Sequence, residues 1–226
     1  MASVLVTLLP LIIGSAIVPI QIILIVLMLT SDERPVAKAL AFTGGMIAVR
    51  IVQGVLFGFI FIGGAGASQD AEGSGWIVST LLTVLGILLL TAAWKTWIDN
   101  EDPDAPPPAW LTMTDDMSPL AALTLGAGLI LISPKLWVFT LGAIGEIGDA
   151  GLGQTADIIT FLLFVILTQS LMLIPIALRV LLPERSDAVL TATSDWLEKY
   201  SDTIVITVSL VFGVLFLYKG ISGFFS

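Results

Sequence analysis

The stretch ILISPKLWVF (residues 130–139) places a proline and a lysine inside a run of apolar residues. It belongs to a longer segment, about 118–147, in which Lys135 is the only charged residue between Met117 and Gly145. A helix of about 20 apolar residues crosses a hydrocarbon core of about 30 Å. The segment is therefore long enough to be a transmembrane helix, with a proline and a positive charge deep inside it.

Five other segments have the same apolar character. The chain of 226 residues is 57% hydrophobic and 12% charged, against about 45–50% apolar and about 25% charged in a soluble domain. The other segments cover about 4–30, 36–62, 76–98, 155–182 and 200–224. We therefore predict an all-α polytopic membrane protein with six transmembrane helices, located in the plasma (inner) membrane.

The positive charges between these segments predict the orientation of the chain. Lysine and arginine are retained on the cytoplasmic side of membrane proteins. Here they lie in the first, third and fifth loops and their flanks, at Arg34, Lys38, Lys95, Arg179, Arg185 and Lys199. We expect these loops to be cytoplasmic and both termini to be outside. Lys219, near the outer end of the last segment, is the exception.

An acidic linker divides the chain into two parts. Residues 99–116 (DNEDPDAPPPAWLTMTDD) contain six acids and four prolines, a composition typical of a solvated linker. We predict a first three-helix repeat over 1–98, a linker over 99–117 and a second three-helix repeat over 118–226. An odd number of helices in each repeat inserts the second copy upside down, which is the inverted repeat of many secondary transporters.

The first helix of each predicted repeat has a proline near its middle. GSAIVPIQIIL (14–24) and GLILISPKLWVF (128–139) both begin with glycine and continue through apolar residues to Pro19 and Pro134. A proline inside a helix has no N–H and its ring collides with an earlier carbonyl, so we expect helices one and four to be kinked or broken there. Exposed backbone at membrane depth is tolerated where it lines a cavity. The alternative is a kink that serves packing alone.

Two cations lie deep in the predicted helices, and no carboxylate accompanies them. Lys135 is about 25 Å along the fourth helix and Arg50 about 21 Å along the second. A charge at the bilayer centre costs about 2.5–3.5 kcal/mol, so such residues are functional candidates. A metal cation would require acidic oxygen ligands. We therefore predict a site for an anionic group, with the substrate-binding candidates Lys135, Arg50, Pro134, Ser133, Pro19, Gln21, Gln53 and Gln169.

Other interpretations of the two cations stay open. Either side chain could reach the headgroup region or be held by backbone carbonyls, and the glutamines could join helices to one another. The chain contains no cysteine and no histidine, which excludes disulfides and the usual zinc and copper sites. We expect no catalytic residues, no metal and no cofactor, and hence no enzyme. A net charge of −9 argues against nucleic acid as a partner.

These motifs resemble those of a known family. A proline in helix one (IVPIQ, 17–21) and S-P-K in helix four (LISPKLWVF, 131–139) resemble the LysE superfamily of small six-helix exporters. LLPLIIGSAIVPIQIILIVLML (8–29) and AFTGGM (41–46) are most similar to its GAP or Sap branch, the glycolipid- and sulfolipid-addressing proteins. The chain departs from the superfamily at Ser133, where asparagine is more usual, and at Pro19, which lacks the P-G-P pattern of amino-acid exporters.

The resemblance implies export, or movement between leaflets, of a lipid or lipid-linked molecule. Combined with the two cations, it predicts a membrane transporter for a cargo with an anionic headgroup, which passes through a central site. One alternative is an amino-acid or small-metabolite exporter of LysE type. The other is a non-transporting scaffold of an envelope-lipid assembly complex that uses residues 99–116 as its contact. The predicted partners are an anionic lipid or small anionic substrate and the lipid bilayer, and a homodimer is left open.

Overall fold

The computed structural model describes residues 2–58, 72–98 and 117–225. The helices of the described part are α1 (Ala2–Ala16), α2 (Pro19–Thr30), α3 (Pro35–Gly58), α4 (Glu72–Ile98), α6 (Pro119–Ile132), α7 (Pro134–Asp149), α8 (Gln154–Thr168), α9 (Ser170–Leu181) and α10 (Pro183–Gly223). The predicted linker lies outside the described residues, apart from Met117.

The helices indicate a polytopic membrane protein. α3 and the parts Ser79–Ile98 of α4 and Lys199–Gly223 of α10 are each long and apolar enough to cross a membrane. Three bent pairs pass the same test when each is taken as one span: α1 with α2, α6 with α7, and α8 with α9. The described residues therefore contain up to six spans, which is the number predicted from the sequence.

The first and fourth spans are broken at the predicted prolines. α1 and α2 meet at an angle of 59°, and α6 and α7 at an angle of 75°. Pro19 and Pro134 each occupy the start of the second helix, where the missing N–H leaves no bond unmade and the ring suits the helical φ. The residues before them, Val18 and Ser133, are extended, as the proline ring requires.

A third break, in the fifth span, was not predicted. The sequence predicted one helix over 155–182, whereas α8 ends at Thr168 and α9 begins at Ser170 with a bend of 60°. The Thr168 hydroxyl donates a hydrogen bond of 2.8 Å to the Val165 carbonyl. Bonds of this kind compete with the backbone ladder and bend helices. The prediction of a continuous helix was wrong because no proline or glycine marks this position.

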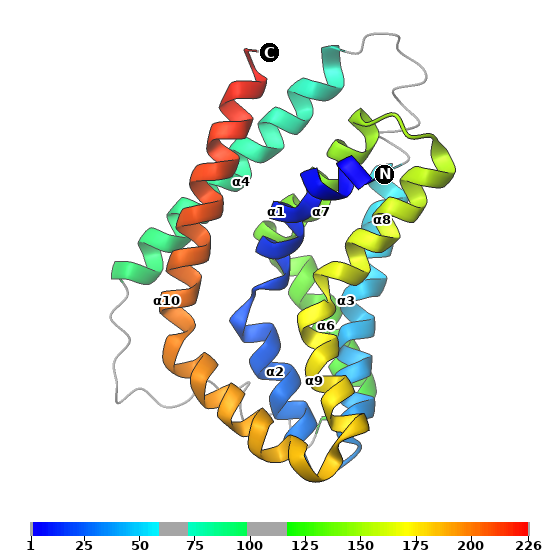
Figure 1. Cartoon of the computed structure of the whole chain (residues 1–226), viewed down its shortest axis with the longest axis vertical. Coiled ribbons are helices and arrows are strands. Elements are labelled where there is room, and N and C mark those ends of the chain that lie inside the picture. Colours follow the sequence, from blue (N-terminus) through cyan, green and yellow to red (C-terminus); the bar gives the residue numbers. More distant parts are fainter. Residues whose placement is uncertain (1, 59–71, 99–116, 226) are drawn as a thin grey trace.

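α10 is longer than the predicted sixth span. Its 41 residues correspond to about 60 Å, twice the thickness of a hydrocarbon core. Only Lys199–Gly223 is apolar enough to span. In Figure 1 the first half of α10 (orange) runs across the lower end of the molecule, and the second half rises beside α4.

The first span lies at the centre of the fold. Figure 1 shows α1 and α2 between the α4–α10 pair on one side and α3, α6, α8 and α9 on the other. Glycines allow the flanking pairs to approach closely. A Cβ on Gly126 of α6 would collide with the Phe42 carbonyl of α3, and a Cβ on Gly220 of α10 would collide with Thr83 of α4. The central span is therefore enclosed by tightly packed helix pairs.

Candidate functional site

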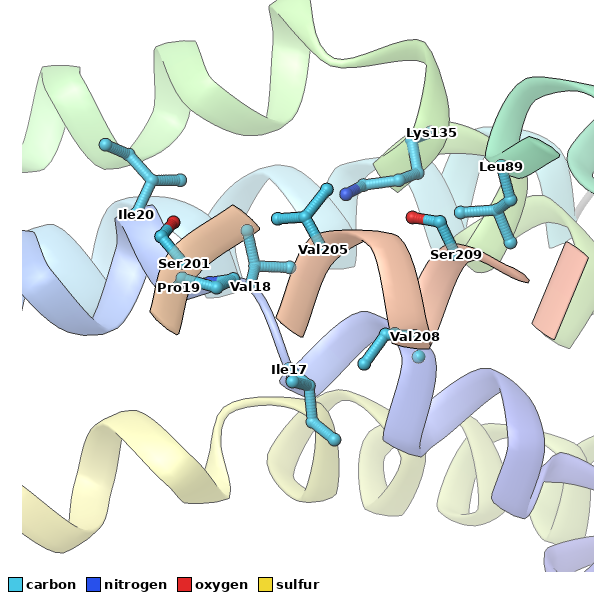
Figure 2. A pocket seen from close by; sticks show the side chains of 11 residues that line it. Ile17, Val18, Pro19, Ile20, Leu89, Lys135, Ser201, Val205, Val208 and Ser209 are labelled. Carbon is cyan, nitrogen blue, oxygen red and sulfur yellow. The ribbon is translucent and has the colours of Figure 1, made fainter. Parts of the chain in front are cut away.

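The breaks in the first and fourth spans border one cavity of about 140 Å³. Its walls come from the α1–α2 break, the first turn of α7, α4 and α10 (Figure 2). The lining residues include Val18, Pro19, Leu89, Lys135, Val205 and Ser209. Both predicted halves of the chain therefore contribute to the same cavity.

Lys135 supplies the charge of this cavity. It follows Pro134 in the first turn of α7 and is half-buried. Figure 2 shows its side chain extending into the cavity alongside Val205 and Ser209. Among the described residues its ammonium group has no hydrogen-bond acceptor and no acidic partner. An ammonium group held in apolar surroundings without a partner favours the arrival of a negative group.

Two helix N-termini add to the positive character of the cavity. α2 begins at Pro19 and α7 at Pro134, and neither N-cap residue, Val18 or Ser133, forms a side-chain capping bond. Proline at the first position has no N–H, and the N–H groups of Gln21 and Leu136 donate to the carbonyls of Val18 and Ser133. The N–H groups of Ile20 and Lys135 remain without an intrahelical acceptor, and the helix dipole is positive there. Such N-termini bind sulfate, phosphate and carboxylate groups. Together with Lys135 they make the cavity suited to an anion.

Arg50 lies behind this cavity rather than in its lining. The side chain is fully buried. Its Nη1 donates to Thr140 Oγ1 at 3.0 Å, and its Nη2 donates to Ser15 Oγ at 2.6 Å. Ser15 belongs to α1 and Thr140 to α7, so Arg50 of α3 connects the two broken spans. Its Nε is without a partner in the described part of the chain.

The remaining predicted site residues lie around the cavity. Gln21, Gln53 and Gln169 are buried, do not line the cavity, and each has an amide atom with no hydrogen-bond partner among the described residues. Ser133 is half-buried and Pro134 is exposed, and neither lines the cavity. Of the predicted residues, the structure places only Lys135 and Pro19 in the lining.

The sequence prediction missed the contribution of α10. Ser201, Val205 and Ser209 line the cavity at intervals of four residues, which places them on one face of the helix. The signal was available in the sequence as two serines spaced by two turns in an apolar helix. Such a spacing does not by itself distinguish a cavity wall from a helix contact.

None of the described residues that line the cavity is acidic. Among the described residues, no group of three or more acids is placed to hold a metal ion. Glu146 of α7 pairs with Lys219 of α10, with Oε1 and Nζ 3.6 Å apart. Lys219, the exception to the predicted charge distribution, therefore has an acidic partner near the ends of both helices.

Comparison with known proteins gives one match. The model of a family described as Sap, sulfolipid-1-addressing protein, matches residues 8–222. The searches of curated proteins and of solved structures each found no match. The matched region contains every residue that lines the cavity.

Proposed function

Because the chain belongs to the Sap, sulfolipid-1-addressing protein, family, we propose that it is a membrane transporter for a lipid with an anionic headgroup. The headgroup enters the Lys135 cavity on its way across the membrane or between its leaflets. The protein acts as a carrier and not as an enzyme. The observation that carries this proposal is the Lys135 ammonium, which extends without a partner among the described residues into a cavity bordered by two helix N-termini.

The chemistry of the cavity suits a sulfate, phosphate or carboxylate group. The headgroup oxygens accept hydrogen bonds from the ammonium of Lys135 and from the backbone N–H groups of Ile20 and Lys135, at the starts of α2 and α7. Ser201 and Ser209 add hydroxyl donors on the opposite wall. Lysine is a compact charge on a flexible chain, so its ammonium can remain bound while the headgroup moves within the cavity.

An inverted repeat provides a mechanism for this movement. α10, the last span of the second half, packs against α2 of the first half, while α4, the last span of the first half, packs against α7 of the second. The last span of each half thus packs against a broken span of the other half. This reciprocal packing supports two repeats related by an axis in the membrane plane. In such transporters one repeat rocks against the other around a fixed central site. The Arg50 bonds to Ser15 and Thr140 keep the α1 and α7 sides of that site together.

Aromatic residues support the proposed membrane placement. Trp76 and Phe224 pack at one end of the α4–α10 pair, with ring centroids 6.1 Å apart. Exposed Trp94 and Trp97 lie at the other end of α4, and Trp196 packs against Tyr200 just where the apolar part of α10 begins. Tryptophan and tyrosine favour the two membrane interfaces. With the charge distribution, this supports an inner-membrane protein with both termini outside.

The volume of the cavity is also compatible with a second candidate function. An apolar cavity of about 150 Å³ holds a molecule of the size of benzene, so a cavity of about 140 Å³ accepts a headgroup or a small metabolite but no whole lipid. A small-metabolite exporter, as in the wider LysE superfamily, is therefore the alternative. The family membership favours the lipid. Placement in that superfamily stays a prediction, as does the scaffold role, whose contact at 99–116 lies outside the described residues.

Replacement of Lys135 tests the proposal. Purified protein in phosphatidylcholine vesicles receives a fluorescent sulfated glycolipid, and chemical quenching of the outer leaflet reports its movement. A charged hydrogen bond contributes about 1.5–3 kcal/mol, so Lys135→Met is expected to slow transport about tenfold or more. Lys95→Met, which removes an exposed lysine outside the cavity, is the matched control. Equal transport by both variants would remove Lys135 from the site.

A further inference from the structure

A second cavity, of about 240 Å³, lies between α2, α9 and α10. From α9 it is lined by Leu171, Ile174, Pro175 and Leu178, which share one face at intervals of three and four residues. Thr193 and Trp196 are the lining residues with a polar side-chain atom. The groove is therefore apolar, whereas the Lys135 cavity carries a positive charge.

The groove and the Lys135 cavity follow one another along the same helix. Thr193 and Leu197 of α10 line the groove, and Ser201, Val205 and Ser209 line the cavity. Each of these five positions is four residues, slightly more than one turn, from the next, so the row winds gradually around α10 from the groove to the cavity. Leu197 and Ser201 are one turn apart, about 6 Å along the axis.

α2 also contributes residues to both sites. Its first residues, Pro19 and Ile20, line the Lys135 cavity, and Ile22 lines the groove. Figure 1 shows α2 between α9 and α10 at the lower end of the molecule, where the two outer helices meet at residues 181–183. The groove and the cavity therefore follow one another along both α2 and α10.

The groove is open on one side and closed beneath. Ile174 and Trp196 at its rim are 61% and 54% exposed, whereas Leu190 at its base is 1% exposed. Ile174 belongs to the α8–α9 pair, which passes the membrane-span test, so its exposed apolar side chain suits contact with lipid. An acyl chain can therefore enter the groove sideways from the bilayer.

We propose that this groove binds one acyl chain of the lipid whose headgroup occupies the Lys135 cavity. The inference rests on the proposed function and adds the second half of the recognition. The Lys135 cavity is too small for a whole lipid, and the groove beside it has room for a chain segment and side chains that exclude water. The protein thereby selects an amphiphile with a negative head and a linear apolar tail, and rejects a small anion that lacks the tail.

Photochemical cross-linking locates the chain. The probe is phosphatidylglycerol with a diazirine on one acyl chain, added to the full-length protein in phosphatidylcholine nanodiscs. After illumination, mass spectrometry identifies the labelled residues. We expect labels concentrated within 171–178 and 189–197, the segments that line the groove.

A matched pair of variants tests occupancy. Ile174→Trp adds bulk in the groove, and Val180→Trp adds the same bulk elsewhere on α9, at a residue that is 57% exposed against 61% for Ile174. Ile174→Trp is expected to reduce labelling of the groove about tenfold, the loss expected when roughly two methylene groups are no longer buried. Val180→Trp is expected to leave labelling unchanged. Thermal unfolding of both variants reports whether they are folded.

The outcomes separate this inference from the proposed function. Labels spread over the exposed faces of α3 and α4, or equal labelling of the two variants, would overturn the groove even if transport depends on Lys135. A dimer whose groove is left unlabelled would assign the groove to a contact between two copies and also overturn the inference. Groove labelling that depends on Ile174, with transport unaffected by Lys135→Met, would support the groove and remove the headgroup site.

Discussion

Lys135 and Arg50 are both cations in the apolar centre of the protein, but their surroundings differ. Arg50 is fully buried and donates to Ser15 and Thr140, which lie 35 and 90 residues away in the sequence. Lys135 is half-buried and extends into a cavity, with no acceptor for its ammonium among the described residues. The planar guanidinium suits fixed hydrogen bonds, and the flexible ammonium suits a ligand that comes and goes. The comparison places Arg50 in a fixed hydrogen-bonded framework and is consistent with the proposed binding of cargo by Lys135.

The largest effect on stability is expected when Arg50 is truncated. Arg50→Ala leaves a cavity between α1, α3 and α7 and removes the donor to two buried hydroxyl groups, so the free energy of unfolding should fall by about 2–5 kcal/mol. Thermal unfolding in detergent, followed by tryptophan fluorescence, measures the loss. If Arg50→Ala unfolds at the same temperature as the unchanged protein, the framework role is wrong and the contrast with Lys135 disappears.

The two acceptors of Arg50 should each contribute a smaller part. Ser15→Ala and Thr140→Ala each remove one hydroxyl and leave one buried guanidinium N–H without a partner, at a cost of about 1–3 kcal/mol. Since both hydroxyls bond the same group, the two changes are expected to be non-additive. A double-mutant cycle measures the coupling. Strict additivity would indicate that Arg50 does not connect α1 with α7.

The sequence predicted the two breaks that place Lys135, because their cause is local. The proline ring removes one backbone hydrogen bond, collides with an earlier carbonyl and favours an extended residue before it, wherever it stands in a helix. Pro10 and Pro175 lie inside α1 and α9, so proline favours a break without requiring one. The partners of Arg50 were not predictable in the same way. Ser15 and Thr140 are ordinary helix residues until folding brings three spans together. The break at Thr168 escaped prediction because threonine is compatible with a continuous helix and bends it only in some settings.

The α10 wall of the cavity also could not be predicted from the sequence. All faces of an apolar helix look similar in sequence, so the register of Ser201, Val205 and Ser209 depends on the packing of α10 against α2 and α4. A lone charge such as Lys135 is visible because lipid makes it costly. A wall of small and apolar side chains carries no such penalty. Charged and proline positions were therefore predictable, and the apolar half of the site was not.

A third cation provides an intermediate case. Lys219 pairs with Glu146 at 3.6 Å, and the two side chains are 40% and 19% exposed. Exposed ion pairs contribute about 0.2–1 kcal/mol and are screened by salt. Glu146→Gln should therefore lower the unfolding free energy by less than about 1 kcal/mol in dilute buffer and by less still at high salt. If the loss does not change with salt concentration, the pair is shielded from solvent more strongly than its exposed fractions indicate.

The smallest loss of stability is expected at Lys135, although its effect on transport is expected to be large. Lys135→Met removes no hydrogen bond or ion pair to any described residue, and methionine fits an apolar wall, so the unfolding free energy should not fall. Removal of an unpaired charge from apolar surroundings should instead raise it. The measurement is the same thermal unfolding used for Arg50→Ala, with the transport assay run on the same preparation. A residue that is needed for transport and not for stability binds the cargo. If Lys135→Met destabilises the protein as much as Arg50→Ala does, both cations belong to the framework, and the anion must be held by the helix N-termini alone.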